Sequence, residues 1–204
     1  MAEAIEGILL AAGESRRMGF FPKPLLRIGE QTFLARCATS MLTVMPRLVI
    51  VVGAHREEVQ AAVPADERIS VAENPAYQRG QLSSIKVGIG ALSPAAEAVI
   101  VHLVDHPAVA PETFQRLVLE YQASHNPIVV ARCGARRGHP VLFAREVFQE
   151  LLEAPEEIGA RAVVNAAPNR VVYVDIDDPG VLLDLDTPED LARAGLPAPP
   201  LRRY

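Results

Sequence analysis

The chain contains three nearly uninterrupted apolar runs, each followed by residues that suit a loop. The runs occupy residues 5–12, 48–53 and 98–104, and the second is almost entirely β-branched. Continuous apolar runs of this length are typical of strands that are buried on both faces of a parallel sheet. Segments at 31–45 and 55–63 instead carry apolar residues at helical spacing. This alternation of strands and helices predicts an α/β fold with a mostly parallel sheet.

The rest of the chain continues the pattern. We expect a short strand at 68–72, helices at 82–91, 111–124, 144–153 and near 158–166, strands at 127–131 and 171–175, and a hairpin or strand pair within 132–143. Thr187 followed by Pro188 predicts a helix start, because Thr is a favoured N-cap and Pro suits the first helical position. We expect one domain over residues 1–196 and a flexible, Pro-rich tail at 197–204.

Composition excludes several classes of function. The 204 residues are half hydrophobic, so the chain can bury a sizeable core, and the net charge of -5 argues against a general nucleic-acid binder. The apolar runs are too short to cross a bilayer, and the acidic first residues do not fit a signal peptide. Cys37 and Cys133 lack metal-site spacing and are interpreted as free thiols. We therefore expect a cytoplasmic protein that does not bind a membrane.

The loop after the first apolar run combines small residues with cations: Gly13, Ser15, Arg17, Gly19 and Lys23. Small residues let backbone N–H groups approach an anion, and the cations favour phosphate. The loop is not a P-loop, since Pro24 follows Lys23. Because ligands of parallel sheets bind at the carboxyl ends of strands, we expect this loop, the end of strand 48–53 and Asp105 at one edge. The alternative is that Arg17 and Lys23 are solvated cations.

Acidic residues follow two of the expected strands. Asp105 ends the run 98–104, where a carboxylate suits Mg²⁺; the alternative is a cap of the next turn. Asp184 and Asp186 would point to the same side of an extended strand, which predicts either a second metal ligand from one or both, or a hydrated turn. His106 either contacts substrate or simply begins its loop.

Two further segments are candidates for ligand contacts. The loop at 73–84 carries small residues that either contact a base or ribose or cap the next helix: Gly80, Ser83 and Ser84. The segment Gly138-His139-Pro140 either borders an acceptor pocket or forms a plain β-turn. The sequence has no G-x-S-x-G motif, and its histidines are scattered, so a protein nucleophile is not expected.

The segment LLAAGESRRMGFFPKPLL resembles the signature L-x-A-G-x-S-x-R-M-G-x(3)-K-x-L-L of the MobA-like nucleotidyltransferases. The resemblance extends over roughly residues 5–195. Later segments are similar, in the same order, to motifs of the molybdenum cofactor cytidylyltransferase branch: ENPAYQRGQLSSIKVGI, HLVDHPAV, GHPVLF, IGARAVV and LDLDTPEDL.

This resemblance implies a fold and a reaction. The fold would be a Rossmann-like three-layer α/β fold of the nucleotide-diphospho-sugar transferase type. A phosphate of the acceptor would attack the α-phosphorus of a nucleoside triphosphate in line, and pyrophosphate would leave with Mg²⁺. For this branch the substrates would be CTP and molybdopterin carrying molybdenum, with a molybdoenzyme as a further partner.

The resemblance also implies roles for particular residues. Gly13, Arg17 and Lys23 match the triphosphate loop, Asp105 the metal-binding Asp, Gly80 and Ser84 the base-side loop, and His139 the acceptor-side turn. The candidate nucleotide contacts are Leu10, Ala11, Ala12, Gly13, Ser15, Lys23, Gly80, Ser83 and Ser84. The catalytic candidates are Lys23, Arg17 and Asp105, the acceptor contacts His106 and His139, and the metal ligands Asp105, Asp184 and Asp186.

Two departures from the branch leave alternatives open. The branch commonly reads Asp-Gln-Pro where this chain has Asp105-His106-Pro107, and it often has an Asp shortly before its G-A-R, where this chain has Glu157-Ile158-Gly159. A guanylyltransferase, or an enzyme with another phosphate acceptor, is therefore the alternative within this class. An alternative of another class is a non-catalytic carrier of nucleotide or molybdopterin. A carrier would need no metal, and the presence of both Lys23 and Asp105 argues against it.

Overall fold

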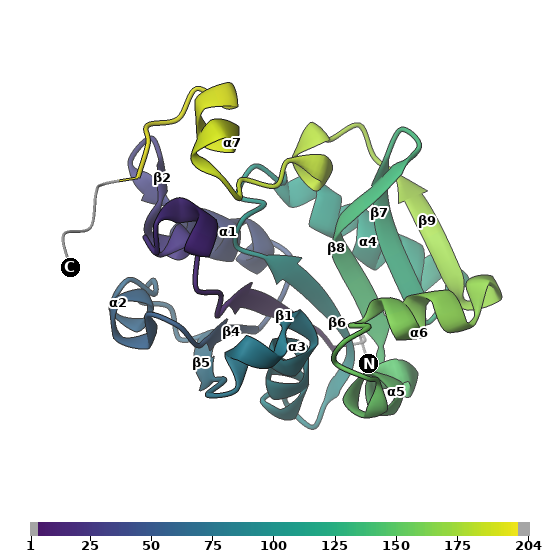
Figure 1. Ribbon diagram of the computed structural model, residues 1–204. Coiled ribbons are helices and arrows are strands. Elements are labelled where there is room, and N and C mark those ends of the chain that lie inside the picture. The colour runs from purple at the N-terminus through teal and green to yellow at the C-terminus, as the bar shows by residue number, and fades with distance from the viewer. Residues whose placement is uncertain (1–3, 200–204) are drawn as a thin grey trace.

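A seven-stranded sheet forms the centre of the protein, as a computed structural model covering residues 4–199 shows (Figure 1). The strand order is β5-β4-β1-β6-β8-β7-β9. The strands are β1 (Ala4–Ala11), β4 (Leu48–Val52), β5 (Ile69–Glu73), β6 (Ala96–Leu103), β7 (Ile128–Cys133), β8 (Arg136–Ala144) and β9 (Val171–Asp175). Only β8 among them runs antiparallel to its neighbours. A separate ribbon pairs β2 (Arg27–Ile28) with β3 (Gln31–Thr32). The predicted α/β fold is confirmed.

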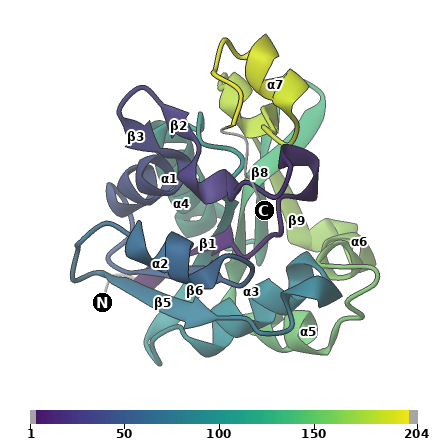
Figure 2. The same cartoon turned by 60° about the vertical axis from the view of Figure 1, so that its left-hand side comes forward.

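Helices cover both faces of this sheet. They are α1 (Phe33–Leu42), α2 (Arg56–Ala61), α3 (Gln81–Gly90), α4 (Pro111–Ser124), α5 (Phe148–Glu153), α6 (Arg161–Ala166) and α7 (Pro188–Arg193). Helices α1 and α4 pack on one face and α3, α5 and α6 on the other (Figure 1). Figure 2 shows β5 and α2 at one side of the molecule and β9 with α6 at the opposite side. The result is a three-layer arrangement.

Alternate residues of the strands enter two separate apolar cores. Leu9 of β1 and Ile50 of β4 are paired and belong to the core under α1 and α4. Their neighbours Ile8 and Val49 are also paired and belong to the core under α3 and α5. Successive side chains of a strand point to opposite faces, so a strand covered on both sides is apolar at nearly every position. This is why the central strands read as continuous apolar runs.

Helix α1 is shorter than the expected helix at 31–45. Its start is fixed by Thr32, whose hydroxyl accepts a hydrogen bond from the Ala35 N–H at 3.1 Å as an N-cap. The helix expected at 144–153 begins instead with the 3₁₀ turn η4 (Arg145–Val147), and α5 follows it. Other short 3₁₀ turns are η1 (Arg16–Met18), η2 (Lys23–Leu25), η3 (Tyr77–Arg79), η5 (Pro168–Arg170) and η6 (Pro179–Leu182).

The β-turn interpretation of Gly138-His139-Pro140 is wrong, because these residues lie inside β8. The turn of the β7–β8 hairpin lies earlier, where Gly134 has a φ of +58°. Residues 138–140 fall where the pairing between β7 and β8 is interrupted. A proline can be tolerated at such a bulge, because no ladder hydrogen bond is required from it.

Three segments meet at the carboxyl edge of the parallel strands, as expected. The Ala54 N–H, just past β4, donates to the carbonyl of Ala12 at 3.0 Å, and the Val104 N–H donates to Leu10 at 3.2 Å. The loops after β1, β4 and β6 are therefore brought together at this edge.

The described residues contain no helix that is both long and apolar enough to cross a membrane. Residues 197–199 have no regular structure, and 200–204 lie outside the described residues, so the flexible tail stays a prediction.

Candidate active site

The loop after β1 is folded back on itself by Ser15. Ser15 has a φ of 55°, and its hydroxyl accepts a hydrogen bond from the Lys23 backbone N–H at 3.0 Å. This bond closes the loop and fixes where the Lys23 side chain begins. A Cβ atom added at Gly13 would meet no protein atom within 4 Å. Space is therefore open over the backbone at Gly13, as a phosphate-binding loop requires.

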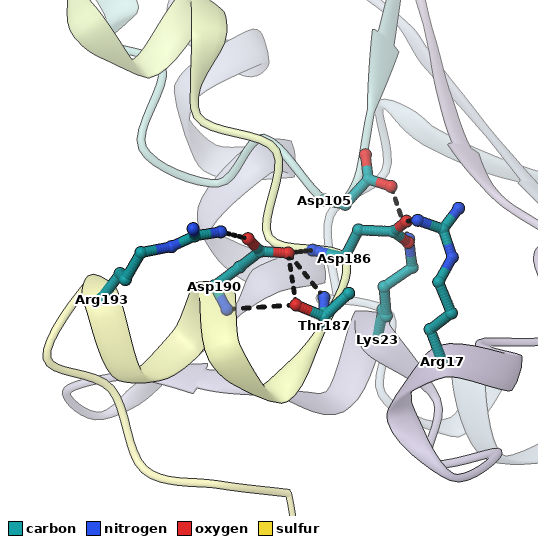
Figure 3. A network of polar contacts seen from close by, with 7 residues as sticks. All are labelled: Arg17, Lys23, Asp105, Asp186, Thr187, Asp190 and Arg193. Atoms are coloured by element: carbon teal, nitrogen blue, oxygen red, sulfur yellow. Dashed lines mark hydrogen bonds and ion pairs between the residues drawn. The ribbon is translucent and has the colours of Figure 1, made fainter.

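The Lys23 ammonium lies between two carboxylates (Figure 3). Its Nζ is 2.6 Å from Asp105 Oδ2 and 2.7 Å from Asp186 Oδ1, and its side chain is only 12% exposed. Burial alone would lower the pKa of Lys23, but the charges of Asp105 and Asp186 raise it above its ordinary value. Burial likewise would raise the pKa of Asp105, and the Lys23 charge holds it below the ordinary value. The cation and Asp105 are both charged at neutral pH.

Asp186 also forms an ion pair with the exposed guanidinium of Arg17. The start of α7 holds this aspartate in place. Asp190 Oδ2 accepts hydrogen bonds from the backbone N–H groups of Asp186 at 3.2 Å and Thr187 at 2.8 Å. Thr187 and Asp190 form a reciprocal capping box, which confirms Thr187 as the N-cap (Figure 3).

The segment with Asp184 and Asp186 is not a strand, which corrects the expectation of an extended strand. It follows η6, and a hydrogen bond from the Leu185 N–H to the Asp105 carbonyl, at 2.9 Å, ties it to the loop after β6. Leu185 is fully buried. The two aspartates consequently have different surroundings. Asp186 pairs with the cations, whereas Asp184 lies near Asp105 and His106.

Asp105, His106 and Asp184 form a group that fits a divalent cation. One potential ligand atom from each residue lies within 4.8 Å of the other two. Asp105 Oδ1 is buried and has no hydrogen-bond partner among residues 4–199. Burial and the charge of Asp105 raise the pKa of Asp184 above its ordinary value. An orphaned carboxylate oxygen beside a second, repelled carboxylate suits a cation between them.

Three histidines gather behind Asp105. His102 is buried on β6, and its ring meets the Phe114 ring edge-on at 5.1 Å between centroids. The rings of His106 and His139 lie 5.3 Å apart, so β8 does bring His139 to the edge where Asp105 lies. Burial lowers the pKa of His102 to about 3 and that of His139 to about 4, and the nearby His106 ring adds to both shifts. Both rings are therefore neutral near neutral pH.

The base-side candidates Ser83 and Ser84 are used inside the protein. Both are buried, and their hydroxyls accept hydrogen bonds from the Asn74 side-chain amide at 2.8 and 2.9 Å. Neither hydroxyl caps α3, whose N-cap is Gly80 with no side-chain capping bond. The serines hold the loop before α3 against Asn74, and Gly80 has a φ of +102°. These hydrogen bonds therefore fix the shape of the loop before α3.

A cavity opens beside the loop after β1, and the sequence analysis did not predict it. Its volume is about 460 Å³, and its lining residues are Glu14, Arg16, Phe20, Ala54, His55 and Tyr77. They come from three separate parts of the chain. Gly53 is the sequence feature that could have indicated this convergence. A Cβ at Gly53 would lie 2.8 Å from Tyr77 Cβ and 2.9 Å from Ala12 Cβ. A glycine required by such close approach marks the place where these loops converge.

Comparison with known families identifies this arrangement. Residues 7–171 match the MobA-like NTP transferase domain. The chain belongs to the MobA-like NTP transferase family. It is therefore a nucleotidyltransferase, and its fold is that of the nucleotide-diphospho-sugar transferases, as the resemblance implied.

Curated relatives extend over nearly the whole chain. This MobA-like protein is 25% identical to the molybdenum cofactor cytidylyltransferase of Escherichia coli, over 94% of this chain and 95% of that protein. It is 29% identical to nicotine blue oxidoreductase of Paenarthrobacter nicotinovorans, over 93% and 95%. It is 30% identical to the molybdenum cofactor guanylyltransferase of Cereibacter sphaeroides, over 92% and 94%.

A solved structure of Rv0371c from Mycobacterium tuberculosis, in complex with manganese, is also similar to this MobA-like protein. The two are 30% identical and superpose with a TM-score of 0.73, over 95% of this chain and 98% of that one.

Proposed function

We propose that this protein transfers CMP from CTP to the phosphate of molybdenum-loaded molybdopterin and releases pyrophosphate. The observation that carries this proposal is the 2.6 Å contact of Lys23 with Asp105, which supports assigning the cation to the triphosphate and the carboxylate to a metal. The order of the later sequence motifs and the similarity to the Escherichia coli cytidylyltransferase support the choice of CTP and molybdopterin.

The triphosphate would bind over the backbone of the loop after β1. This backbone runs through Leu10, Ala11, Ala12 and Gly13, and Ser15 holds it in shape. Lys23 and Arg17 would then exchange the Asp186 carboxylate for phosphate oxygens, which carry more negative charge. The base would lie toward Gly80 and the loop shaped by Ser83 and Ser84.

Asp105 and Asp184 would hold the divalent cation, which we take to be Mg²⁺ or Mn²⁺. The buried Asp105 Oδ1, which lacks a partner in the described chain, supports this assignment. The manganese complex of Rv0371c supports it as well. When bound, the cation would supply positive charge opposite the α-phosphate and the leaving pyrophosphate.

In the reaction, a phosphate oxygen of the acceptor attacks the α-phosphorus and forms a new P–O bond. The bond from the α-phosphorus to the oxygen bridging to the β-phosphorus breaks, and its electron pair leaves with pyrophosphate. Lys23 and Arg17 neutralise charge that develops on the leaving group. His139, on β8, would border the acceptor. No protein nucleophile is needed for this displacement.

The test is a pyrophosphate-release assay with CTP, GTP, UTP and ATP, each with molybdenum-loaded molybdopterin and a divalent cation. We expect release with CTP, and product analysis should show the cytosine dinucleotide form. A strong preference for GTP would overturn the cytidylyl assignment in favour of guanylyl transfer. Tight CTP binding without turnover on this acceptor would instead favour the carrier alternative. A control without acceptor measures background hydrolysis.

A further inference from the structure

His106 directly follows Asp105, and the fold turns its side chain toward the two carboxylates of the metal group. Its ring contributes one of the three potential ligand atoms that lie within 4.8 Å of each other. The residue is only 6% exposed. An imidazole buried beside two carboxylates is positioned for coordination rather than for solvent.

A hydrogen bond selects which ring nitrogen of His106 is free. Its Nδ1 lies 3.4 Å from the carbonyl oxygen of Gly180. A carbonyl can only accept, so Nδ1 carries the proton and donates it, and Nε2 is left with its lone pair. Metal-binding histidines usually have this arrangement, in which the second ring nitrogen donates to a carbonyl or carboxylate.

The carbonyl that orients His106 is itself held firmly. A Cβ at Gly180 would lie 2.5 Å from the carbonyl oxygen of Ala108, so η6 packs closely against the loop after β6. Asp178, at the start of η6, accepts hydrogen bonds from the Ala110 N–H at 2.9 Å and the Thr113 hydroxyl at 2.6 Å. The orientation of the imidazole is therefore set by the fold before any ligand binds.

The two carboxylate oxygens of Asp105, the residue before His106, have different surroundings. Asp105 Oδ2 is taken by Lys23 at 2.6 Å. Asp105 Oδ1 is buried and unpartnered within the described residues, on a side chain that is otherwise largely buried. A buried carboxylate oxygen without a donor is costly unless a cation completes it. This unsatisfied oxygen is an independent indication of a cation beside His106.

We propose that His106 Nε2 is a metal ligand together with Asp105 and Asp184, and that this nitrogen makes the enzyme prefer Mn²⁺ to Mg²⁺. The inference deepens the proposed function, on which its relevance to nucleotidyl transfer rests. Mg²⁺ is a hard ion that favours oxygen ligands and retains several waters, whereas imidazole favours transition-metal ions. This assignment replaces the expected role of His106 as an acceptor contact.

The test is electron spin echo spectroscopy of Mn²⁺ bound to the full-length protein without nucleotide or acceptor. We expect ¹⁴N modulation from a directly bound imidazole, and a ¹⁵N pattern in protein labelled with [¹⁵N]histidine. In H106Q the nitrogen modulation should vanish. Mn²⁺ affinity, from the free-ion EPR signal, should fall on the order of tenfold. Mg²⁺ affinity, from competition with Mn²⁺, should change much less, because the Gln side chain can offer an oxygen.

H139Q is the matched control, because it alters the neighbouring ring and should retain the ¹⁴N modulation. H106N, checked by circular dichroism, is a second variant in case H106Q does not fold. Wild-type Mn²⁺ without nitrogen coupling, or a preference for Mg²⁺, would overturn the inference. Because the spectra are recorded without substrates, they are independent of the pyrophosphate assay. A nitrogen-bound Mn²⁺ in a protein that transfers no nucleotide would refute the proposed function while leaving the ligand assignment intact.

Discussion

Lys23 Nζ and Asp186 Oδ1 lie 2.7 Å apart, which joins the loop after β1 to the segment before α7. The same aspartate pairs with Arg17, so one carboxylate occupies both cations that we assign to the triphosphate. A bound nucleotide would have to displace it. Asp186 is therefore interpreted as a competitor for the cations, and Asp184 as the metal ligand.

This relationship predicts that Asp186→Asn tightens nucleotide binding in the absence of a divalent cation. The substitution removes the ion pairs of Asp186 with Arg17 and Lys23. Losing this competition is worth about 1 kcal/mol, so the Kd for CTP should fall about fivefold. Isothermal titration calorimetry in the presence of a metal chelator measures this Kd. Asp184→Asn is the control, and it should weaken Mn²⁺ binding instead. Weaker Mn²⁺ binding in Asp186→Asn would identify Asp186 as a metal ligand and contradict this interpretation.

The capping box at the start of α7 predicts a modest effect of Thr187→Ala on stability. The Thr187 hydroxyl accepts from the Asp190 N–H at 3.2 Å, and losing such an N-cap costs about 1 kcal/mol. Urea denaturation should show this loss in the free energy of unfolding. Glu189→Ala, an exposed residue of the same helix, should change it by less than about 0.5 kcal/mol. Equal effects of the two variants would argue that the cap contributes nothing specific.

Close packing at Gly138 predicts that Gly138→Ala is destabilising. The added Cβ would collide with the backbone carbonyl of Val181, and backbone atoms cannot move aside as a flexible side chain can. We expect a loss of about 1–3 kcal/mol in the free energy of unfolding, the usual range for overpacking. Gly90→Ala is the matched control, because a Cβ there meets nothing within 4 Å. A stability like that of the wild type in Gly138→Ala would show that η6 can shift away from β8.

The sheet could be predicted from the sequence because its signal is local. Strands such as β4 are covered on both faces, so every residue of Leu48–Val52 is buried and the run is continuous. Asp105 could be found for the same reason, since it directly follows such a run. The segment around His139 misled the prediction, because Gly and Pro usually mark turns, whereas here they lie in an unpaired stretch of β8.

The site itself could be predicted only in part. The sequence around Lys23 and Arg17 predicts a phosphate-binding loop, but the pairing of these cations with Asp186 depends on contacts between distant parts of the chain. The buried hydrogen bonds of Ser83 and Ser84 with Asn74 were equally hidden. A hydroxyl near a loop gives no sign in the sequence of whether it faces a ligand or a neighbouring side chain.

The most direct test of the account is pyrophosphate release by Lys23→Gln, with CTP, molybdenum-loaded molybdopterin and a divalent cation. Lys86→Gln is the matched control, because Lys86 lies on α3 and donates to the Ala154 carbonyl at 3.0 Å, away from Asp105. Circular dichroism and thermal unfolding should verify that both variants fold. We predict a loss on the order of 10²-fold or more for Lys23→Gln and less than about threefold for the control. Wild-type rates of release in a folded Lys23→Gln protein would contradict the assignment of this site to nucleotidyl transfer.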